Sequence, residues 1–279
     1  MAEQRIGIMQ GRLSARPEHR LQAFPHQTWP EEFAQAKRLG FSYLEWIYEA
    51  ERAPENPIAS HAGRAAIRAC SAASGLPVGS VCGDYFMIHR LAGGSEQARA
   101  ENAAALSELV RWTRELGATR ILLPLLETSA VDTPEQKREV TESIRRVCPA
   151  LEAYDIVLGL EMEIPGHEYA ALIQGIGHPN VRAYYDTGNS TAQGLNIETD
   201  IAPLLPLLEA VHLKDRVVAG TSQPFGRGAA NFAGLFRVLE RAGYAGDFLT
   251  QHYFDAEPEA SAAHSLGFVR EQLRARKAA

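Results

Sequence analysis

The chain has 279 residues, of which 46% are hydrophobic and 22% are charged, as is usual for a globular protein. Its 34 acidic residues outnumber its 28 lysines and arginines, and no segment concentrates basic side chains, so nucleic acid is not an expected partner. No window approaches the roughly 20 apolar residues of a membrane span, and the N-terminus has no signal-peptide pattern. The three cysteines lack metal-type spacing. These features predict a cytoplasmic metabolic enzyme with reduced thiols.

Short apolar runs alternate with longer amphipathic segments along the whole chain. The runs with strand character are, in order, residues 5–9, 43–47, 77–81, 120–125, 157–162, 181–185, 210–213 and 248–250. Segments with helical spacing lie between them, among them residues 30–39, 97–116, 134–154 and 232–242. Three of these helical segments end next to Gly40, Gly117 and Gly243, and glycine closes helices readily because it accepts a left-handed backbone. Residues 51–57 contain two prolines and are expected to form a long loop over the barrel mouth.

This alternation predicts an α/β fold in which each strand is followed by a helix. Eight units of about 35 residues each suit a single (β/α)8 TIM barrel that spans residues 1–279 as one domain. A doubly wound open sheet shares the alternation, but it would prefer a GxGxxG turn after the first strand. The chain instead has Gln10, Gly11 and Arg12 at that point, which favours the barrel.

Four polar residues lie near the C-terminal ends of the last four apolar runs: Glu161, Asp186, His212 and Gln251. They are 25, 26 and 39 residues apart, so successive βα units would bring them to the same mouth of a barrel. Taken singly, they could be a buried ion pair, a turn cap or a core histidine. Taken together, they predict a ring of metal ligands.

The donor set determines which ions and reactions this ring suits. Carboxylate oxygens and an imidazole nitrogen suit one divalent ion, Mn²⁺, Mg²⁺, Co²⁺ or Zn²⁺. Such an ion could bind adjacent oxygens of a sugar-like ketone and stabilise the enediolate formed by proton abstraction next to the carbonyl. The expected bases are Glu161, Glu163 and Glu127, and Lys214 is expected to act as an acid or as a clamp on a substrate oxygen.

Positive side chains and glycines gather at the same predicted rim. Gly226 and Gly228 flank Arg227, and their backbone N–H groups could approach an anionic group on a substrate. Arg12 and Arg216 are expected at this rim as well, which favours a phosphorylated or carboxylated substrate. The same loop could be an ordinary flexible connection, and the arginines could be solvated or form dimer contacts.

The chain resembles the sugar phosphate isomerase/epimerase superfamily of xylose-isomerase-like barrels, which includes ketose 3-epimerases, hydroxypyruvate isomerases, inosose dehydratases and endonuclease IV. The resemblance covers nearly the whole chain and rests on residues 6–13 (IGIMQGRL), 159–161 (GLE), 185–189 (YDTGN), 211–215 (VHLKD) and 224–228 (PFGRG). The HLKD segment followed by the glycine-rich loop is its most specific part. The resemblance implies a xylose-isomerase-like TIM barrel.

The resemblance also implies ligands for one divalent metal. The family uses Glu, Asp, His and Glu from strands five to eight, which match Glu161, Asp186 and His212 here, while the fourth position aligns with Gln251. An amide oxygen can bind a hard cation, but it cannot act as a carboxylate base. Ketose 3-epimerases of the family use two metal-bound glutamates, one on each face of the substrate. The chain would therefore run a one-base isomerisation from Glu161 or recruit another residue, such as Glu127 or Lys214, for epimerisation.

The resulting hypothesis is a metal-dependent sugar or sugar-phosphate isomerase or epimerase. Its substrate contacts are expected to come from Asn189 of the YDTGN motif together with the rim arginines. Three alternatives remain: an inosose-type lyase on the same metal site, an endonuclease IV-like phosphodiesterase, which needs more ligands and a basic groove, and a non-catalytic sugar-binding barrel. The expected partner is a small sugar, with no nucleic acid or membrane involved, and the family implies a homo-oligomer, a dimer or a tetramer.

Overall fold

Parallel strands close into an eight-stranded barrel in the computed structural model, which describes residues 4–15, 22–253 and 256–278. The barrel strands are β1 (Ile6–Met9), β2 (Tyr43–Ile47), β3 (Val78–Cys82), β4 (Arg120–Leu125), β5 (Val157–Met162), β6 (Val181–Asp186), β7 (Leu208–Leu213) and β10 (Asp247–Thr250). Strand β10 pairs in parallel with both β7 and β1, which closes the ring. The predicted (β/α)8 barrel is therefore confirmed and the open sheet is excluded.

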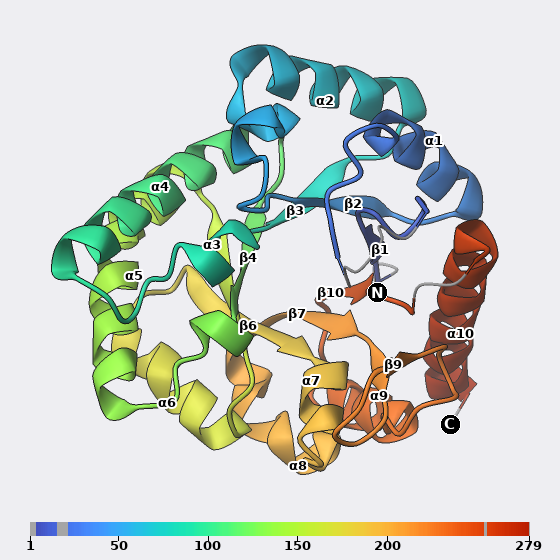
Figure 1. Ribbon diagram of the computed structural model, residues 1–279. Helices are drawn as coiled ribbons and strands as arrows, with labels where there is room; N and C mark the ends of the chain where they lie inside the picture. Colours follow the sequence, from blue (N-terminus) through green and yellow to red (C-terminus); the bar gives the residue numbers. More distant parts are fainter. Residues whose placement is uncertain (1–3, 16–21, 254–255, 279) are drawn as a thin grey trace.

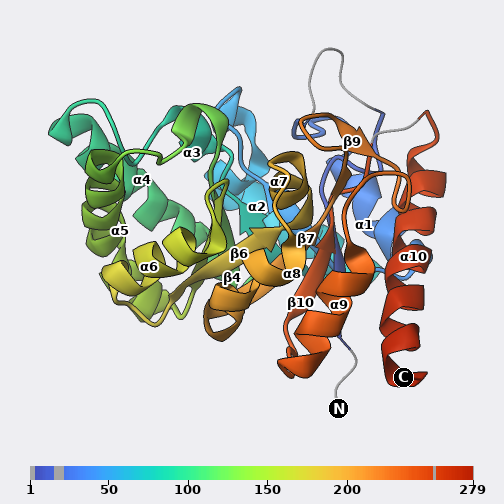
Figure 2. The ribbon, with the colours of Figure 1, turned by 90° about the horizontal axis from the view of Figure 1, so that it is seen from below.

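A layer of helices surrounds the strands (Figure 1). It is formed by α1 (Trp29–Leu39), α2 (His61–Ser74), α4 (Glu96–Glu115), α5 (Pro134–Tyr154), α6 (Gly166–Ile176), α9 (Phe232–Arg241) and α10 (Pro258–Ala278). Short elements fill the connections, namely α3 (Tyr85–Ile88), α7 (Thr187–Ala192), α8 (Ile197–Asp200), η1 (Ala53–Glu55), η2 (Pro57–Ala59), η3 (Glu127–Ser129), η4 (Ala202–Leu207) and the hairpin of β8 (Asp215–Arg216) and β9 (Ser222–Gln223). Figure 2 shows α3 and β9 on the same side of the molecule. None of the described helices is both long and apolar enough to span a bilayer.

The predicted element boundaries agree with the structure to within two residues. Helix α5 and strands β2, β4 and β5 have the predicted bounds, and Gly40, Gly117 and Gly243 all have positive φ angles at helix ends. Strand β7 begins two residues earlier than predicted, because Leu208 pairs with Ala183 of β6 across a register shift. The expected loop at residues 51–57 contains two short 3-10 turns with proline at an early position, where the missing N–H costs nothing.

The apolar core has two parts, separated by the sheet. Side chains that alternate along each strand point either into the barrel or toward the helices. The interior cluster consists of Met9, Tyr43, Ile47, Cys82, Leu122, Tyr184, Ala210 and Leu249. The larger cluster lies between the strands and the helices and includes Leu44, Trp46, Leu158 and Leu160. Every second residue of a strand therefore faces the interior.

Two tyrosines occupy the barrel interior because neighbouring strands present glycine beside them. A Cβ atom placed on Gly7 or Gly79 would lie 2.4 or 2.5 Å from the Tyr43 ring, and one on Gly159 would lie 2.7 Å from the Tyr184 ring. Contacts this short are incompatible with van der Waals packing. The glycines thus provide the space that the aromatic rings fill.

Charged groups cover the end of the barrel at which the strands begin. Arg120 is buried, forms an ion pair with Asp247, and has its guanidinium 5.7 Å from the Tyr43 ring centroid. Arg5 also pairs with Asp247 and lies 5.3 Å from the same ring. This end is held closed by structural ion pairs, which leaves the opposite end for chemistry.

Replacement of Gly79 by alanine tests the packing of the interior. The added methyl group would collide with Tyr43, whose hydroxyl is held by a 3.1 Å hydrogen bond to the Phe248 carbonyl. We expect the free energy of unfolding to fall by about 1–3 kcal/mol, as for other overpacked cores. Chemical denaturation measures this change.

The matched control is Gly267→Ala on α10, where no atom lies within 4 Å of the added methyl. That variant is expected to be more stable by about 0.5–1 kcal/mol, because alanine costs less backbone entropy in a helix. Equal effects of the two substitutions would contradict the steric explanation.

Candidate metal centre and active site

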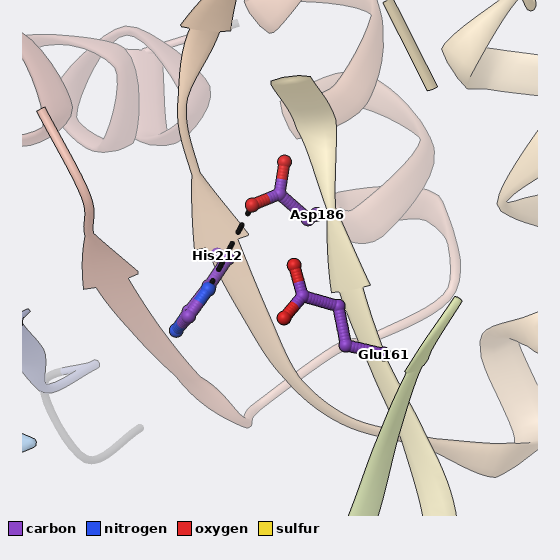
Figure 3. A group of neighbouring side chains, drawn as sticks. All are labelled: Glu161, Asp186 and His212. Carbon is purple, nitrogen blue, oxygen red and sulfur yellow. Dashed lines mark ion pairs between the residues drawn. The ribbon is translucent and has the colours of Figure 1, made fainter. Parts of the chain in front are cut away.

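Three neighbouring strands bring Glu161, Asp186 and His212 together at the mouth of the barrel. Glu161 is the fifth residue of β5, Asp186 ends β6, and His212 of β7 is the register partner of Asp186. One ligand atom from each residue lies within 4.8 Å of the others, and all three residues are buried. Figure 3 shows both carboxylates directed toward the imidazole ring. The predicted convergence of these three side chains is thus observed.

Two atoms of this cluster are buried without a hydrogen bond. Asp186 Oδ2 and His212 Nδ1 are 3.7 Å apart, and neither makes a hydrogen bond within the described residues. The other oxygen of Asp186 accepts from the Asn189 N–H at 2.9 Å, and the Asn189 side chain donates to Glu161 Oε1 at 2.9 Å. Buried polar atoms nearly always have partners. Asp186 Oδ2 has the Lys214 ammonium group 3.4 Å away, but neither atom has the short hydrogen bond expected of a buried group, which indicates a shared ligand.

The electrostatics of the cluster favour a positive charge. Burial and the Asp186 charge raise the pKa of Glu161 to about 8. Burial lowers the pKa of His212, but Glu45, Asp186 and Glu161 outweigh it and raise that pKa to about 10. Burial raises the pKa of Asp186, yet the Lys214 and His212 charges hold it well below its usual range. The cluster thus attracts cations, and its oxygen and imidazole donors suit a hard or borderline divalent ion.

Lys214 lies directly beside the cluster. Its Nζ atom is 3.4 Å from Asp186 Oδ2, and its side chain is 15% exposed. The stem of Lys214 packs over Gly188, where a Cβ atom would lie 2.6 Å from Lys214 Cδ. The Thr187 hydroxyl donates to the Lys214 carbonyl and accepts from its N–H. The glycine of the YDTGN motif thus leaves the space through which the ammonium group reaches the site.

The structure fixes the orientation of the Gln251 amide. Gln251 follows β10, is buried, and lies two residues after Leu249 of the barrel interior. Its Nε2 donates to Gln22 Oε1 at 2.7 Å. Its Oε1 is buried and has no hydrogen-bond partner in the described part of the chain. The oxygen is therefore the atom of this side chain that is available to a ligand.

Two residues near Gln251 were not predicted from the sequence. Gln22 Nε2 donates to Asp84 Oδ2 at 2.5 Å, and the Cys82 thiol donates to Asp84 Oδ1 at 3.1 Å. Burial raises the pKa of Asp84. Asp84 follows the end of β3, so the strand-end argument that identified Asp186 would also have identified it. Gln22 lies in a loop and carries no comparable signal.

The rim arginines occupy three different environments. Arg216 donates twice to the Gly220 carbonyl, at 3.0 and 2.9 Å, and its Nη1 is 3.5 Å from Asn189 Oδ1. Arg12 is 6% exposed, and its Nη2 is 3.4 Å from Gln22 Oε1. Arg227 is exposed. Arg216 therefore orients Asn189, whereas Arg227 can reach solvent.

The expectation that the amides of Gly226 and Gly228 face a ligand is corrected by the structure. Both N–H groups donate to Asp215 Oδ2 at 2.9 Å, and the Ala230 N–H donates to Asp215 Oδ1 at 3.1 Å. A Cβ atom on Gly228 would lie 2.1 Å from the Asp215 carboxylate. These glycines thus close the loop around Asp215, and their amides are not free for a phosphate.

Two further predicted carboxylates lie outside the three-residue cluster. Glu163 is half-buried, and burial, together with Glu127 and Asp186, raises its pKa against the effect of Arg216. Glu127 is exposed and begins η3 with a φ angle of 47°. Exposure makes Glu127 a weaker candidate for a base than Glu161.

Comparison with known proteins agrees with the observed fold. UlaE of Escherichia coli (strain SMS-3-5 / SECEC), an L-ribulose-5-phosphate 3-epimerase, is 22% identical over 257 residues, which cover 88% of this chain and 90% of UlaE. The structure of L-ribulose 3-epimerase superimposes with a TM-score of 0.79 at 18% identity and covers 99% of this chain and 96% of that one. D-psicose 3-epimerase of Clostridium cellulolyticum H10 with D-tagatose gives 0.76 at 18% identity and covers 96% and 99%. Residues 33–272 match the family described as xylose isomerase-like TIM barrel, and the chain belongs to that family.

Proposed function

We propose that the chain is a divalent-metal-dependent isomerase or epimerase of a sugar or sugar phosphate. The observation that carries the proposal is the buried cluster of Glu161, Asp186 and His212, whose ligand atoms lie within 4.8 Å of one another. The open positions on Asp186 Oδ2 and His212 Nδ1 support the same conclusion. The substrate class is supported by UlaE, whose name specifies a phosphorylated ketose.

Glu161, Asp186 and His212 would hold one Mn²⁺, Mg²⁺, Co²⁺ or Zn²⁺ ion, with Gln251 Oε1 as a fourth ligand. Such an ion polarises a carbonyl and offsets the negative charge that develops on its oxygen. The side chains around it supply the remaining functions: a base, a fixed cation and hydrogen bonds that orient both.

Glu161 is the proposed base. Its Oε1 is held by the Asn189 amide at 2.9 Å, which orients the carboxylate in the site. The C–H bond next to the carbonyl breaks, the proton passes to Glu161, and the electron pair moves through the new C=C bond to the carbonyl oxygen. The Lys214 ammonium group, 3.4 Å from Asp186, provides a nearby cation for that oxygen. Return of the proton completes the reaction.

The carbon that receives the proton decides between isomerisation and epimerisation. Return to the neighbouring carbon needs Glu161 as the single base at carbon, while the proton of the neighbouring hydroxyl group passes to the former carbonyl oxygen. Inversion of one carbon instead needs a proton donor on the opposite face. The Gln251 amide cannot serve as that donor, because a side-chain amide is not an acid or a base near neutral pH. Asp84 is the carboxylate linked to Gln251 through Gln22, and we propose it ahead of the exposed Glu127 as the second acid or base.

The proposed substrate contacts are Asn189 and the rim arginines. Asn189 and Arg216 act together, since Arg216 Nη1 lies 3.5 Å from the Asn189 side-chain oxygen. The exposed Arg227 can reach an anionic group outside the buried cluster. In this proposal a phosphorylated sugar binds with its hydroxyl groups at the cluster and its phosphate toward the rim.

Metal binding is tested on purified, chelator-treated protein. We expect about one divalent ion to bind per chain, and Mn²⁺ at one hundred times its dissociation constant to stabilise the fold by about 2.7 kcal/mol. The stabilisation is measured as a rise in melting temperature on addition of the ion. Asp186→Asn removes a charged ligand and should abolish most of this rise. Asp155→Asn, an exposed position at the end of α5, is the control and should retain it. A wild-type chain whose melting temperature does not respond to any of the four ions would contradict the proposal.

The mechanistic role of position 251 is tested by Gln251→Glu. A second carboxylate at this site restores a base on the opposite face, so we expect 3-epimerisation of ketoses or ketose phosphates to rise at least about tenfold. Gln174→Glu, an exposed position on α6, introduces the same charge without approaching the mouth and should leave the rates unchanged. No change in product distribution for Gln251→Glu would show that the amide does not limit the reaction.

The role of Gly188 is tested by Gly188→Ala. The methyl group would displace the Lys214 stem, and we expect kcat/KM to fall on the order of a hundredfold, because small displacements of catalytic groups are that costly. Gly175→Ala on α6, with no atom within 4 Å of the new methyl, is the matched control. A normal rate for Gly188→Ala would indicate that Lys214 is not needed in its observed place.

A further inference from the structure

A third carboxylate lies beneath the metal cluster, inside the barrel. Glu45 is the middle residue of β2, and its side chain is 0% exposed. It faces the interior, as do Tyr43 and Ile47 on either side of it in the alternating pattern of the strand. A buried carboxylate is costly unless several donors satisfy it. The donors that contact Glu45 therefore indicate its role.

Three donors from three other strands meet at this carboxylate. Glu45 Oε2 accepts from the Ser80 hydroxyl at 2.6 Å and from the Tyr184 hydroxyl at 2.9 Å, while Oε1 lies 2.9 Å from His212 Nε2. Ser80 is the register partner of Glu45 on β3, whereas Tyr184 and His212 reach it from β6 and β7. Glu45 thus connects four strands across the interior. It contacts the Nε2 edge of the His212 ring, and not the Nδ1 edge that faces Asp186.

The contact with His212 determines which ring nitrogen is available to a ligand. An ionised carboxylate only accepts hydrogen bonds. In the neutral ring that binds a metal ion, Nε2 therefore carries the proton and Nδ1 has the lone pair. Nδ1 is the nitrogen that lies 3.7 Å from Asp186 Oδ2 and makes no hydrogen bond within the described residues. Tyr184 holds the ring from another side, since the two ring centroids are 4.8 Å apart at an interplanar angle of 77°.

We propose that Glu45 is a positioning residue of the metal centre, which holds His212 so that Nδ1 faces Asp186 and Glu161. This inference rests on the proposed function, because it assigns a purpose to the orientation of one of its ligands. The negative charge of Glu45 also makes the imidazole a stronger donor, as carboxylate partners of metal-bound histidines do. Ser80 and Tyr184 keep the carboxylate itself in place.

The test is Glu45→Gln, with calorimetric titration of Mn²⁺ into metal-free protein as the measurement. Glutamine keeps the size and one acceptor oxygen but removes the charge, and we expect the dissociation constant to rise about 10- to 100-fold. The matched control is Glu139→Gln in the helix layer, where the buried carboxylate accepts from the Gly93 N–H and pairs with Arg99. That control should bind Mn²⁺ as the wild type does.

Wild-type affinity in Glu45→Gln, or an equal loss in Glu139→Gln, would overturn the inference and leave the proposed function intact. A wild-type chain that binds no divalent ion would instead overturn the proposed function. A second measurement does not depend on any variant: NMR of the zinc-loaded wild type with isotope-labelled histidine should show a proton on Nε2 of His212 and none on Nδ1. A proton on Nδ1 would refute the assignment of Glu45 even if Glu45→Gln fails to fold.

Discussion

The burial of several carboxylates around one imidazole ring is the constraint on which the structure of the barrel mouth depends. Glu45, Glu161 and Asp186 all surround His212, and all are buried. Each buried charge costs several kcal/mol unless it is paired and hydrogen-bonded. Lys214 offsets part of the negative charge, and neutral donors such as Asn189, Ser80 and Tyr184 satisfy individual oxygens. The proposed divalent cation would balance the negative charge that remains.

The packing of the barrel and the geometry of the site share residues. Tyr184 fills the interior beside Gly159, donates to Glu45, and contacts the ring of His212. A change that moves this tyrosine therefore alters both the core and a ligand. Gly188 has a similar double role at the rim, because the space it leaves is occupied by the stem of Lys214. The geometry of the site consequently depends on strand register and on Gly159 and Gly188, as well as on its charged groups.

The sequence predicted the strands and the convergence of Glu161, Asp186 and His212 because both follow from short-range pattern. Each ligand comes at or near the end of an apolar run, and strand ends meet in a barrel. Glu45 was missed because it lies within the run Tyr-Leu-Glu-Trp-Ile, although its alternation with Tyr43 and Ile47 places it inside the barrel. The contacts of Gly226 and Gly228 could not be predicted, since they depend on how the loop folds back onto Asp215. Pairings between distant loops, such as Gln22 with Gln251, leave no periodic signal.

The amide at position 251 links these observations to mechanism. Gln22 accepts from its nitrogen, which leaves its oxygen without a hydrogen bond among the described residues. As the proposed fourth ligand, this oxygen would add no further negative charge to an acidic pocket. A glutamate there would place a third carboxylate beside the proposed ion and provide a second base. Compared with a site that has two metal-bound glutamates, the proposed site keeps four ligands but has one base fewer. Inversion at a single carbon would then need an acid outside the proposed ligand ring. Asp84 is the candidate, because hydrogen bonds connect Gln251 to Gln22 and Gln22 to Asp84.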